Sequence, residues 1–241
     1  SHNTVRTIIE DDQGNIWMGT DGGGLNQLNK NRNRITVMEH QPDQAASISS
    51  NTIRDLYQDQ FGTIWIATWD GLDEFFPFSN QINHYKKNPE DKTSLSDNRV
   101  RTIYEDRKGN FWIGTYGGLN LLDRDKKKFT CFRKDESNSS SISNDRILSI
   151  HEDKKGRLWI GTFKGLNQMG GINGETRIFV HYTTQDGLPN DVIYGILEDD
   201  EGYLWLSTNQ GISRFNPDAK QPAFQNYNVD DGLQSNEFNG G

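Results

Sequence analysis

The sequence predicts an all-β protein, a β-propeller of five four-stranded antiparallel blades, on the strength of three observations. A pattern that is clearest at residues 105–120 occurs five times in the chain. Its tryptophans recur at intervals of 48, 47, 47 and 46 residues: Trp17, Trp65, Trp112, Trp159 and Trp205. Each period holds four short apolar runs separated by polar or glycine-containing turns, and no stretch shows a helical period long enough for a helix. Such even periods mark repeat architectures, and four short strands per period are typical of a propeller blade.

The third period shows the four strands most clearly. Period-2 alternation and turn residues predict strands at Val100–Glu105, Asn110–Thr115, Leu119–Leu122 and Phe129–Phe132. Gly109 lies in the first turn, a tight glycine turn follows the second strand, and a polar loop over residues 134–144 leads to the next period. In the fourth period, Gly170–Gly174 predicts an enlarged turn between the third and fourth strands.

The repeats predict a single propeller segment over residues 1–241. The expected blades cover approximately 4–46, 47–93, 94–140, 141–185 and 186–228, and residues 229–241 would begin a further, truncated blade. Five blades could close into a ring or form an arc of a seven-bladed propeller. An open arc would expose two blade faces of roughly 300 Å² each, at a cost of several kcal/mol. Closure, or capping by a second copy, is therefore favoured.

Composition excludes several classes of function. The formal net charge is −8, and the densest basic run, Lys126–Lys128, is short, so we expect no nucleic-acid partner. No apolar run approaches the length that spans a bilayer, so no membrane contact is expected of this segment. The single cysteine, Cys131, cannot form an internal disulfide and is expected in a strand. The five histidines lack ligand spacing and no cofactor motif is present, so neither a metal nor a cofactor is predicted.

Acidic pairs recur at one turn in most periods, which raises the question of catalysis. They are Asp11-Asp12, Glu105-Asp106, Glu152-Asp153 and Asp199-Asp200. Catalytic carboxylates need unequal environments, whereas these occupy equivalent positions. An Asp that opens a turn can instead accept backbone N–H groups two residues further on. We therefore predict a structural role for these pairs and no enzymatic activity.

Positions where the repeats disagree are better candidates for a binding site than shared positions. The tight turn carries, in chain order, Asp21, Trp69, Tyr116, Phe163 and Asn209. At the start of the innermost strand the corresponding residues are Arg6, Arg54, Arg101, Leu148 and Tyr194. The candidate ligand-binding residues are Trp69, Asp70, Tyr116, Phe163, Lys164, Arg6, Arg54, Arg101 and Tyr194. Aromatic rings beside guanidinium groups would suit an anionic sugar. Alternatively, the rings hold neighbouring blades together and the arginines pair with Asp55 or the turn acids.

The consensus Val/Ile-Arg-x-Ile-x-Glu-Asp-x-x-Gly-x-x-Trp-Ile-Gly-Thr-x-x-Gly-Leu-Asn resembles the two-component regulator propeller repeat over nearly the whole chain. Residues 231–239 resemble the segment near the end of the second propeller in such sensors. The resemblance implies the periplasmic sensor of a hybrid two-component system of gut Bacteroidetes. Members usually carry two seven-bladed propellers, followed by an immunoglobulin-like domain, a membrane helix, a histidine kinase, a receiver and a DNA-binding domain. They sense oligosaccharides and switch on polysaccharide-utilisation genes.

Three functions follow as hypotheses. The leading one is a non-catalytic ligand-sensing module whose partners are an oligosaccharide and the neighbouring propeller, immunoglobulin-like and kinase domains of a parent protein. The second is a protein–protein scaffold, which would self-associate. The third is a five-bladed glycosidase, which would need unshared carboxylates around the central channel. Of the five periods, only the second has an acidic residue, Asp55, at this position of the innermost strand.

Overall fold

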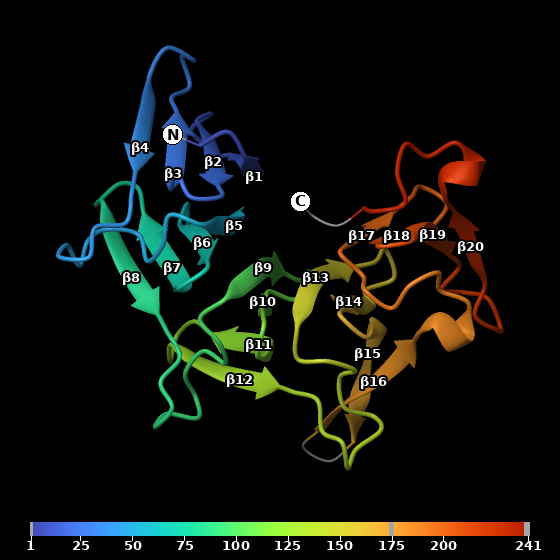
Figure 1. Ribbon diagram of the computed structural model, residues 1–241. Coiled ribbons are helices and arrows are strands. Elements are labelled where there is room, and N and C mark those ends of the chain that lie inside the picture. The colour runs from blue at the N-terminus through green and yellow to red at the C-terminus, as the bar shows by residue number, and fades with distance from the viewer. Residues whose placement is uncertain (1, 174–175, 239–241) are drawn as a thin grey trace. The chain divides into compact units, whose positions relative to one another are not determined.

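The computed structural model describes residues 2–173 and 176–238. Within these residues the chain forms five four-stranded antiparallel sheets and two single-turn 3₁₀ helices, with no longer helix (Figure 1). Strands that are consecutive in sequence are neighbours in each sheet. The predicted all-β propeller-like fold of four-stranded units is therefore confirmed, and the sheets are called blades 1 to 5 below.

The strands have the following bounds. Blade 1 contains β1 (Val5–Glu10), β2 (Ile16–Thr20), β3 (Leu25–Leu28) and β4 (Ile35–Met38). Blade 2 contains β5 (Ile53–Gln58), β6 (Ile64–Thr68), β7 (Gly71–Phe76) and β8 (Gln81–Tyr85). Blade 3 contains β9 (Val100–Glu105), β10 (Phe111–Thr115), β11 (Gly118–Asp123) and β12 (Lys128–Phe132). Blade 4 contains β13 (Ile147–Glu152), β14 (Leu158–Thr162), β15 (Gly165–Asn173) and β16 (Thr176–Tyr182). Blade 5 contains β17 (Gly195–Glu198), β18 (Leu204–Thr208), β19 (Gly211–Phe215) and β20 (Phe224–Tyr227).

The chain divides into two compact units. Unit 1 holds blades 1 to 3 up to Cys131, apart from residues 106–110 and 117–119, which belong with blades 4 and 5 in unit 2. In unit 1 the first strands β1, β5 and β9 lie side by side (Figure 1). In unit 2, β13 lies beside β17. The first strand of each blade is thus its innermost strand.

The two 3₁₀ helices lie in loops whose sequences differ from those of the loops before blades 2, 3 and 4. They are η1 (Thr184–Asp186) and η2 (Val229–Asp231), each followed by a glycine with positive φ. A capping box closes each one, from Thr183 with Asp186 and from Asn228 with Asp231. The second lies in the segment predicted to begin a further blade, of which residues 239–241 lie outside the described part.

One local prediction was wrong. We expected an enlarged turn at Gly170–Gly174, but the residues up to Asn173 continue β15 with a register shift between Met169 and Ile172, and Gly174 lies outside the described residues. A bulge in a strand lets extra residues be accommodated without opening the ladder. Cys131, expected in a strand, lies in β12.

The repeated tryptophans pack against the following blade. The ring centroids of Trp17 and Phe75 are 5.8 Å apart, those of Trp65 and Phe111 4.7 Å, and those of Trp159 and Phe215 5.7 Å. The tryptophans in these pairs are almost fully buried. Each ring therefore supplies the apolar contact that joins two successive blades within a unit.

The repeated Asp of the first turn is structural, as predicted. In each blade one carboxylate oxygen accepts backbone N–H groups two and four residues further on. In blades 1, 2, 4 and 5 the other oxygen accepts the Nε1–H of the repeated tryptophan at 2.7–2.9 Å. Burial opposes ionisation of Asp11, but the hydrogen bonds from Asn15 and Trp17 outweigh it and lower the pKa of this carboxyl.

A polar residue in the third strand holds the loop that leads into the same blade. The side-chain oxygens of Asp73, Asn120 and Asn167 accept the backbone N–H of Ser49, Ser96 and Ser143 at 2.7, 3.1 and 2.9 Å. In blade 5, where η1 replaces this loop, Asn226 donates to the Gly187 carbonyl and accepts from Ser213. The repeated serine and the Asp or Asn of the third strand thus form a buried anchor in blades 2, 3 and 4.

Candidate functional site

The predicted arginines and two of the predicted aromatic residues lie together in unit 1. We call Arg6, Arg54, Arg101, Trp69 and Tyr116 the arginine–aromatic cluster. The arginines come from the inner strands β1, β5 and β9, and the rings come from the tight turns after β6 and β10. All five side chains are partly exposed.

Arg54 occupies the centre of this cluster. Its guanidinium lies 4.5 Å from the ring centroid of Trp69 and its Nη2 lies 3.7 Å from Asp21, which also pairs with Arg6 at 2.5 Å. Burial lowers the pKa of Arg54, and the neighbouring charges of Arg6 and Arg101 lower it further, whereas Asp21 opposes the shift. The buried Nε of Arg54 has no hydrogen-bond partner among the described residues. The cluster thus concentrates positive charge that one aspartate balances only in part.

Trp69 and Tyr116 join blades 2 and 3. Their rings meet edge to face, with centroids 5.3 Å apart and planes at 73°. Each turn is also held by its backbone, because Trp69 N–H donates to Thr52 and Tyr116 N–H donates to Arg99. The alternative in which these rings hold blades together is therefore observed for this pair, and partial exposure leaves ring surface available as well.

Sequence reasoning missed part of the cation–aromatic pattern. The Arg99 guanidinium lies 5.2 Å from the Tyr116 ring centroid, and Arg146 lies 5.1 Å from that of Phe163. Arg99 and Arg146 come two positions before Arg101 and Leu148, the residues that we compared at the start of the innermost strand. Three of the tight-turn rings therefore have an arginine over the ring face. A comparison of the repeats at both arginine positions would have found all three.

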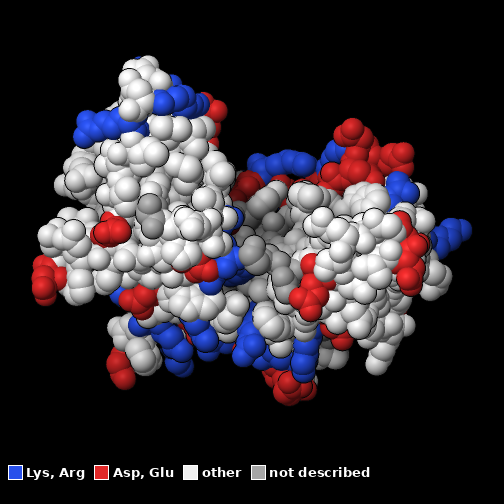
Figure 2. Space-filling view, turned by 45° about the horizontal axis from the view of Figure 1, so that its top comes forward, with Lys and Arg blue, Asp and Glu red and all other residues white. Residues whose placement is uncertain are grey.

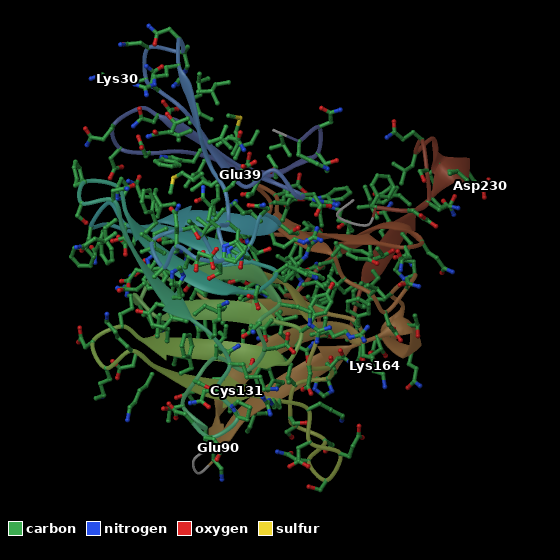
Figure 3. All side chains as sticks on the ribbon, turned by 60° about the vertical axis from the view of Figure 1, so that its left-hand side comes forward. Lys30, Glu39, Glu90, Cys131, Lys164 and Asp230 are labelled. Atoms are coloured by element: carbon green, nitrogen blue, oxygen red, sulfur yellow. The ribbon has the colours of Figure 1, made fainter. Side chains whose placement is uncertain are left out.

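The other predicted residues have different surroundings. Asp70 forms an ion pair with Lys86 at 2.6 Å and accepts from Asn98 at 3.1 Å. Phe163, Lys164 and Tyr194 belong to unit 2, where Lys164 is exposed (Figure 3). Their grouping with the unit 1 cluster stays a prediction.

Asp55 of β5 has the most perturbed carboxyl near the cluster. Burial raises its pKa to about 6, although backbone N–H groups of Ile103 and Leu56, each at 2.9 Å, and the charge of Arg101 favour the ionised form. Because Ile103 belongs to β9, the carboxylate links the inner strands of blades 2 and 3. Arg101 makes no ion pair within 4.0 Å among the described residues, so the predicted pairing with Asp55 is not a direct contact.

A serine, a histidine and an aspartate also meet in blade 2. Ser49 Oγ donates to Asp73 at 2.5 Å, His84 Nδ1 lies 2.7 Å from the same oxygen, and His84 Nε2 lies 2.9 Å from the Ala45 carbonyl. A nucleophilic triad needs the imidazole between serine and carboxylate. Here Ser49 Oγ contacts the carboxylate itself and also lies 3.0 Å from His84 Nδ1, the same nitrogen that contacts Asp73. The imidazole therefore does not bridge serine and carboxylate, and these residues anchor the loop rather than activate a nucleophile.

The remaining charges show no metal centre. Among the described residues, no group of three or more His, Cys, Asp or Glu side chains could hold a metal ion. On the face shown in Figure 2, acidic and basic side chains lie in short groups of both signs. No helix within residues 2–173 and 176–238 is sufficiently long and apolar to cross a bilayer.

Comparison with known proteins gives one family. The model of the two component regulator propeller matches residues 1–22, 47–70, 94–117, 141–164 and 187–210, one match in each period. Among curated proteins, none matches the chain.

Solved structures with the same fold include extracellular domains of two component systems. The extracellular domain of a hybrid two component system from B. thetaiotaomicron is 28% identical, with a TM-score of 0.77, over 92% of this chain and 30% of that one. A second such domain from the same organism is 23% identical, with a TM-score of 0.57, over 94% of this chain and 37% of that one. The chain thus spans less than two fifths of the length of these extracellular domains.

Enzymes share the fold as well. Virginiamycin B lyase from Staphylococcus aureus is 15% identical, with a TM-score of 0.65, over 93% of this chain and 70% of that one. At this identity the likeness concerns the fold alone. A fold of this kind therefore does not by itself decide between an enzyme and a protein without catalytic activity.

Proposed function

Because the chain belongs to the two component regulator propeller family, we propose that it is a non-catalytic ligand-sensing segment of the periplasmic sensor of a hybrid two-component system. The 28% identical structure is the extracellular domain of such a system, which supports this assignment. Since this chain covers 30% of that domain, we assign the rest of the sensing region, and the signalling domains, to further parts of a parent protein.

We propose an oligosaccharide with acidic groups as the ligand. The arginine–aromatic cluster combines ring surface, which can stack on the C–H face of a sugar, with guanidinium groups, which bind carboxylate or sulfate in bidentate fashion. The observation that carries the proposal is the state of Arg54 and Arg101. Arg54 has a buried Nε without a partner, and Arg101 makes no ion pair among the described residues. A bound anion would satisfy both and relieve the repulsion that lowers the pKa of Arg54.

The geometry around Asp55 supports a non-catalytic role. Glycoside hydrolysis usually requires two carboxylates, about 5–9.5 Å apart. The residues equivalent to Asp55 in the other blades are Thr7, Thr102, Ser149 and Gly195, none of which is acidic. The carboxylate of Asp55 itself accepts two backbone N–H groups, from Leu56 of the same strand and from Ile103 of β9, and the second bond joins the two inner strands.

Isothermal titration calorimetry with defined probes tests the proposal. The 241-residue chain is titrated with oligogalacturonate and chondroitin sulfate fragments, and with maltohexaose and xylohexaose as uncharged counterparts. We expect an acidic probe to bind, and Arg101→Gln or Trp69→Ala to weaken that binding at least tenfold, because each removes a direct contact.

Arg32→Gln is the matched control, since Arg32 is an exposed arginine of unit 1 whose ion pair is with Glu10, away from the cluster. Binding that survives both cluster variants would show that the proposed face is wrong. Self-association in light scattering, without saccharide binding, would favour the scaffold function. Turnover of chromogenic glycosides would revive the enzyme hypothesis.

A further inference from the structure

A groove opens at the opposite end of blades 1 and 2 from the arginine–aromatic cluster. It has a volume of about 380 Å³ and is formed by the β1–β2 turn of blade 1 together with the β5–β6 and β7–β8 turns of blade 2. All eleven residues that line it belong to unit 1. Lys30 lies beside it, because its backbone N–H donates to the side-chain oxygen of Asn15 in the wall.

Two phenylalanines stand at this groove with most of their surface in solvent. Phe61 is 74% exposed and Phe78 is 84% exposed. The ring of Phe78 lies over Gly62, where an added Cβ would be 3.7 Å from the ring edge, and Pro77 precedes it. In the other blades the residues equivalent to Phe61 are Gln13, Lys108, Lys155 and Glu201. The exposed ring is therefore a particular feature of blade 2 and is not required by the repeat.

Carboxamides supply the polar part of the lining. They are Gln13, Asn15, Gln27, Gln58 and Gln60. Gln58 accepts the backbone N–H of Asp12 at 2.9 Å and so ties the two walls together. Asn15 is engaged with Asp11 and Lys30. Among the described residues, no hydrogen bond occupies the side chains of the other three glutamines. Each of these three can donate and accept at once, which matches the hydroxyl groups of a sugar.

The charge of the groove differs from that of the arginine–aromatic cluster. Its lining includes Asp11 and Asp12 and no Lys or Arg. Asp12 is exposed, and the lowered pKa of Asp11 keeps its carboxyl ionised at neutral pH. A carboxylated or sulfated ligand would therefore be repelled. The volume lies near the lower end of the range of small-molecule sites, which suits a short ligand rather than a protein.

We propose that this groove binds an uncharged saccharide, with Phe61 and Phe78 stacking on sugar rings and the glutamines bonding to hydroxyl groups. Exposed rings, free carboxamides and the absence of basic lining residues together favour a neutral polyhydroxylated ligand over an anion or an apolar peptide. The site is separate from the arginine–aromatic cluster and would take an uncharged ligand where the cluster takes an anionic one, so it goes beyond the proposed function.

Ligand-observed NMR and calorimetry with uncharged trisaccharides test this site. The probes are cellotriose, maltotriose, mannotriose and xylotriose, added to the 241-residue chain. The double variant Phe61→Gln, Phe78→Asn places the residues of blade 1 at both positions. Since both rings are exposed, the melting temperature should stay unchanged while the affinity for a bound trisaccharide falls at least tenfold. Gln60→Ala should lower it by a smaller factor.

Two controls separate this proposal from others. Leu197→Gln removes an apolar side chain of comparable exposure (73%) from unit 2 and should leave binding unchanged. Arg54→Gln disables the arginine–aromatic cluster and should also leave it unchanged, so failure of the two sites is distinguishable. Binding of none of the four probes, or binding that survives the double variant, would overturn the proposal. A change in oligomeric state on the double substitution, without saccharide binding, would identify a protein-docking surface instead.

Discussion

Blades 2 and 4 are two versions of one repeat, and their differences show which parts of it are fixed. In both, an aspartate accepts the repeated indole N–H at 2.9 Å, Asp59 from Trp65 and Asp153 from Trp159. Around this shared turn, ionisable residues of one blade are replaced by different residues in the other. Asp73 in blade 2 is Asn167 in blade 4, and both hold a serine N–H of the preceding loop. The hydrogen-bond geometry is retained while the charge is not.

The residue opposite the tryptophan shows the same contrast. In blade 2 the hydroxyl of Tyr57 donates to Glu105 at 3.0 Å, and burial with this contact raises the pKa of Tyr57 to about 12. In blade 4 the equivalent His151 has its Nε2 3.9 Å from Glu198. Burial lowers the pKa of His151, although Glu198 opposes the shift. One position thus carries a neutral phenol in one blade and a group that can gain charge in the other.

The largest expected effect concerns the feature that the two blades share. Asp153→Ala leaves the Trp159 indole N–H and two backbone N–H groups without acceptors and removes the 2.5 Å partner of Arg157. We expect a loss of about 3 kcal/mol in the free energy of unfolding, measured by urea denaturation. Asp59→Ala should cost less, because its nearest arginine lies 3.7 Å away and pairs mainly with another carboxylate. Equal losses would contradict the role assigned to Arg157.

A smaller effect is expected at the position where blade 2 has Ala67 and blade 4 has Gly161. A Cβ on Gly161 would lie 2.7 Å from the Ile193 carbonyl oxygen and against the Ser149 hydroxyl. Gly161→Ala should therefore destabilise the protein by about 2 kcal/mol. The reciprocal Ala67→Gly should cost about 1 kcal/mol, through chain entropy and lost packing. Thermal denaturation of both variants measures the difference, and a neutral Gly161→Ala would show that blade 5 can move away.

The smallest effect is the opposite pH dependence of two histidines. The hydrogen bond to Asp73 raises the pKa of His84, so its contribution is complete below about 6.5 and is lost as the pH rises through the folded-state pKa. The lowered pKa of His151 has the reverse sign, so stability is lost as the pH falls below about 6.5.

Urea denaturation between pH 5 and 9 tests this contrast. His84→Gln should reduce stability more at the acidic end than at the basic end, whereas His151→Gln should weaken the acid-induced loss. His181→Gln is the control for a loop-bonded histidine, because its Nε2 contacts the Ser141 carbonyl while its strand partner is the neutral Asn167. Parallel pH profiles for the wild type and both test variants would refute the assignment.

Much of the fold could be predicted from the sequence because its signals are local and repeated. Alternation gave β9 as Val100–Glu105, and the Asp turn followed from hydrogen bonding over a few residues. The bulge at Gly170 and Gly171 was missed because two glycines read as a turn when their strand partners are unknown. The single-turn helices were missed since three residues show no period.

The candidate site was predictable only in part. The comparison of repeats found Arg54 and Trp69, which the fold brings together. It did not reveal that in blade 3 the arginine over the Tyr116 ring is Arg99 and not Arg101. Which of the two guanidinium groups can reach the ring depends on the course of the backbone, which the sequence comparison does not show. The same comparison, applied to the turn after β5, would have found Phe61. The groove beside it is lined by residues of two blades, so neither repeat alone predicts it.

The first turn of each blade, with its repeated Asp, has a consequence for folding kinetics. All the partners of its carboxylate in blades 1, 2, 4 and 5 lie within six residues along the chain, apart from added arginines. Contacts of such short sequence separation close quickly, since little loop entropy is lost. Each hairpin can therefore nucleate alone and present its indole before the next blade has been synthesised, so that assembly can proceed from the amino terminus as the chain emerges.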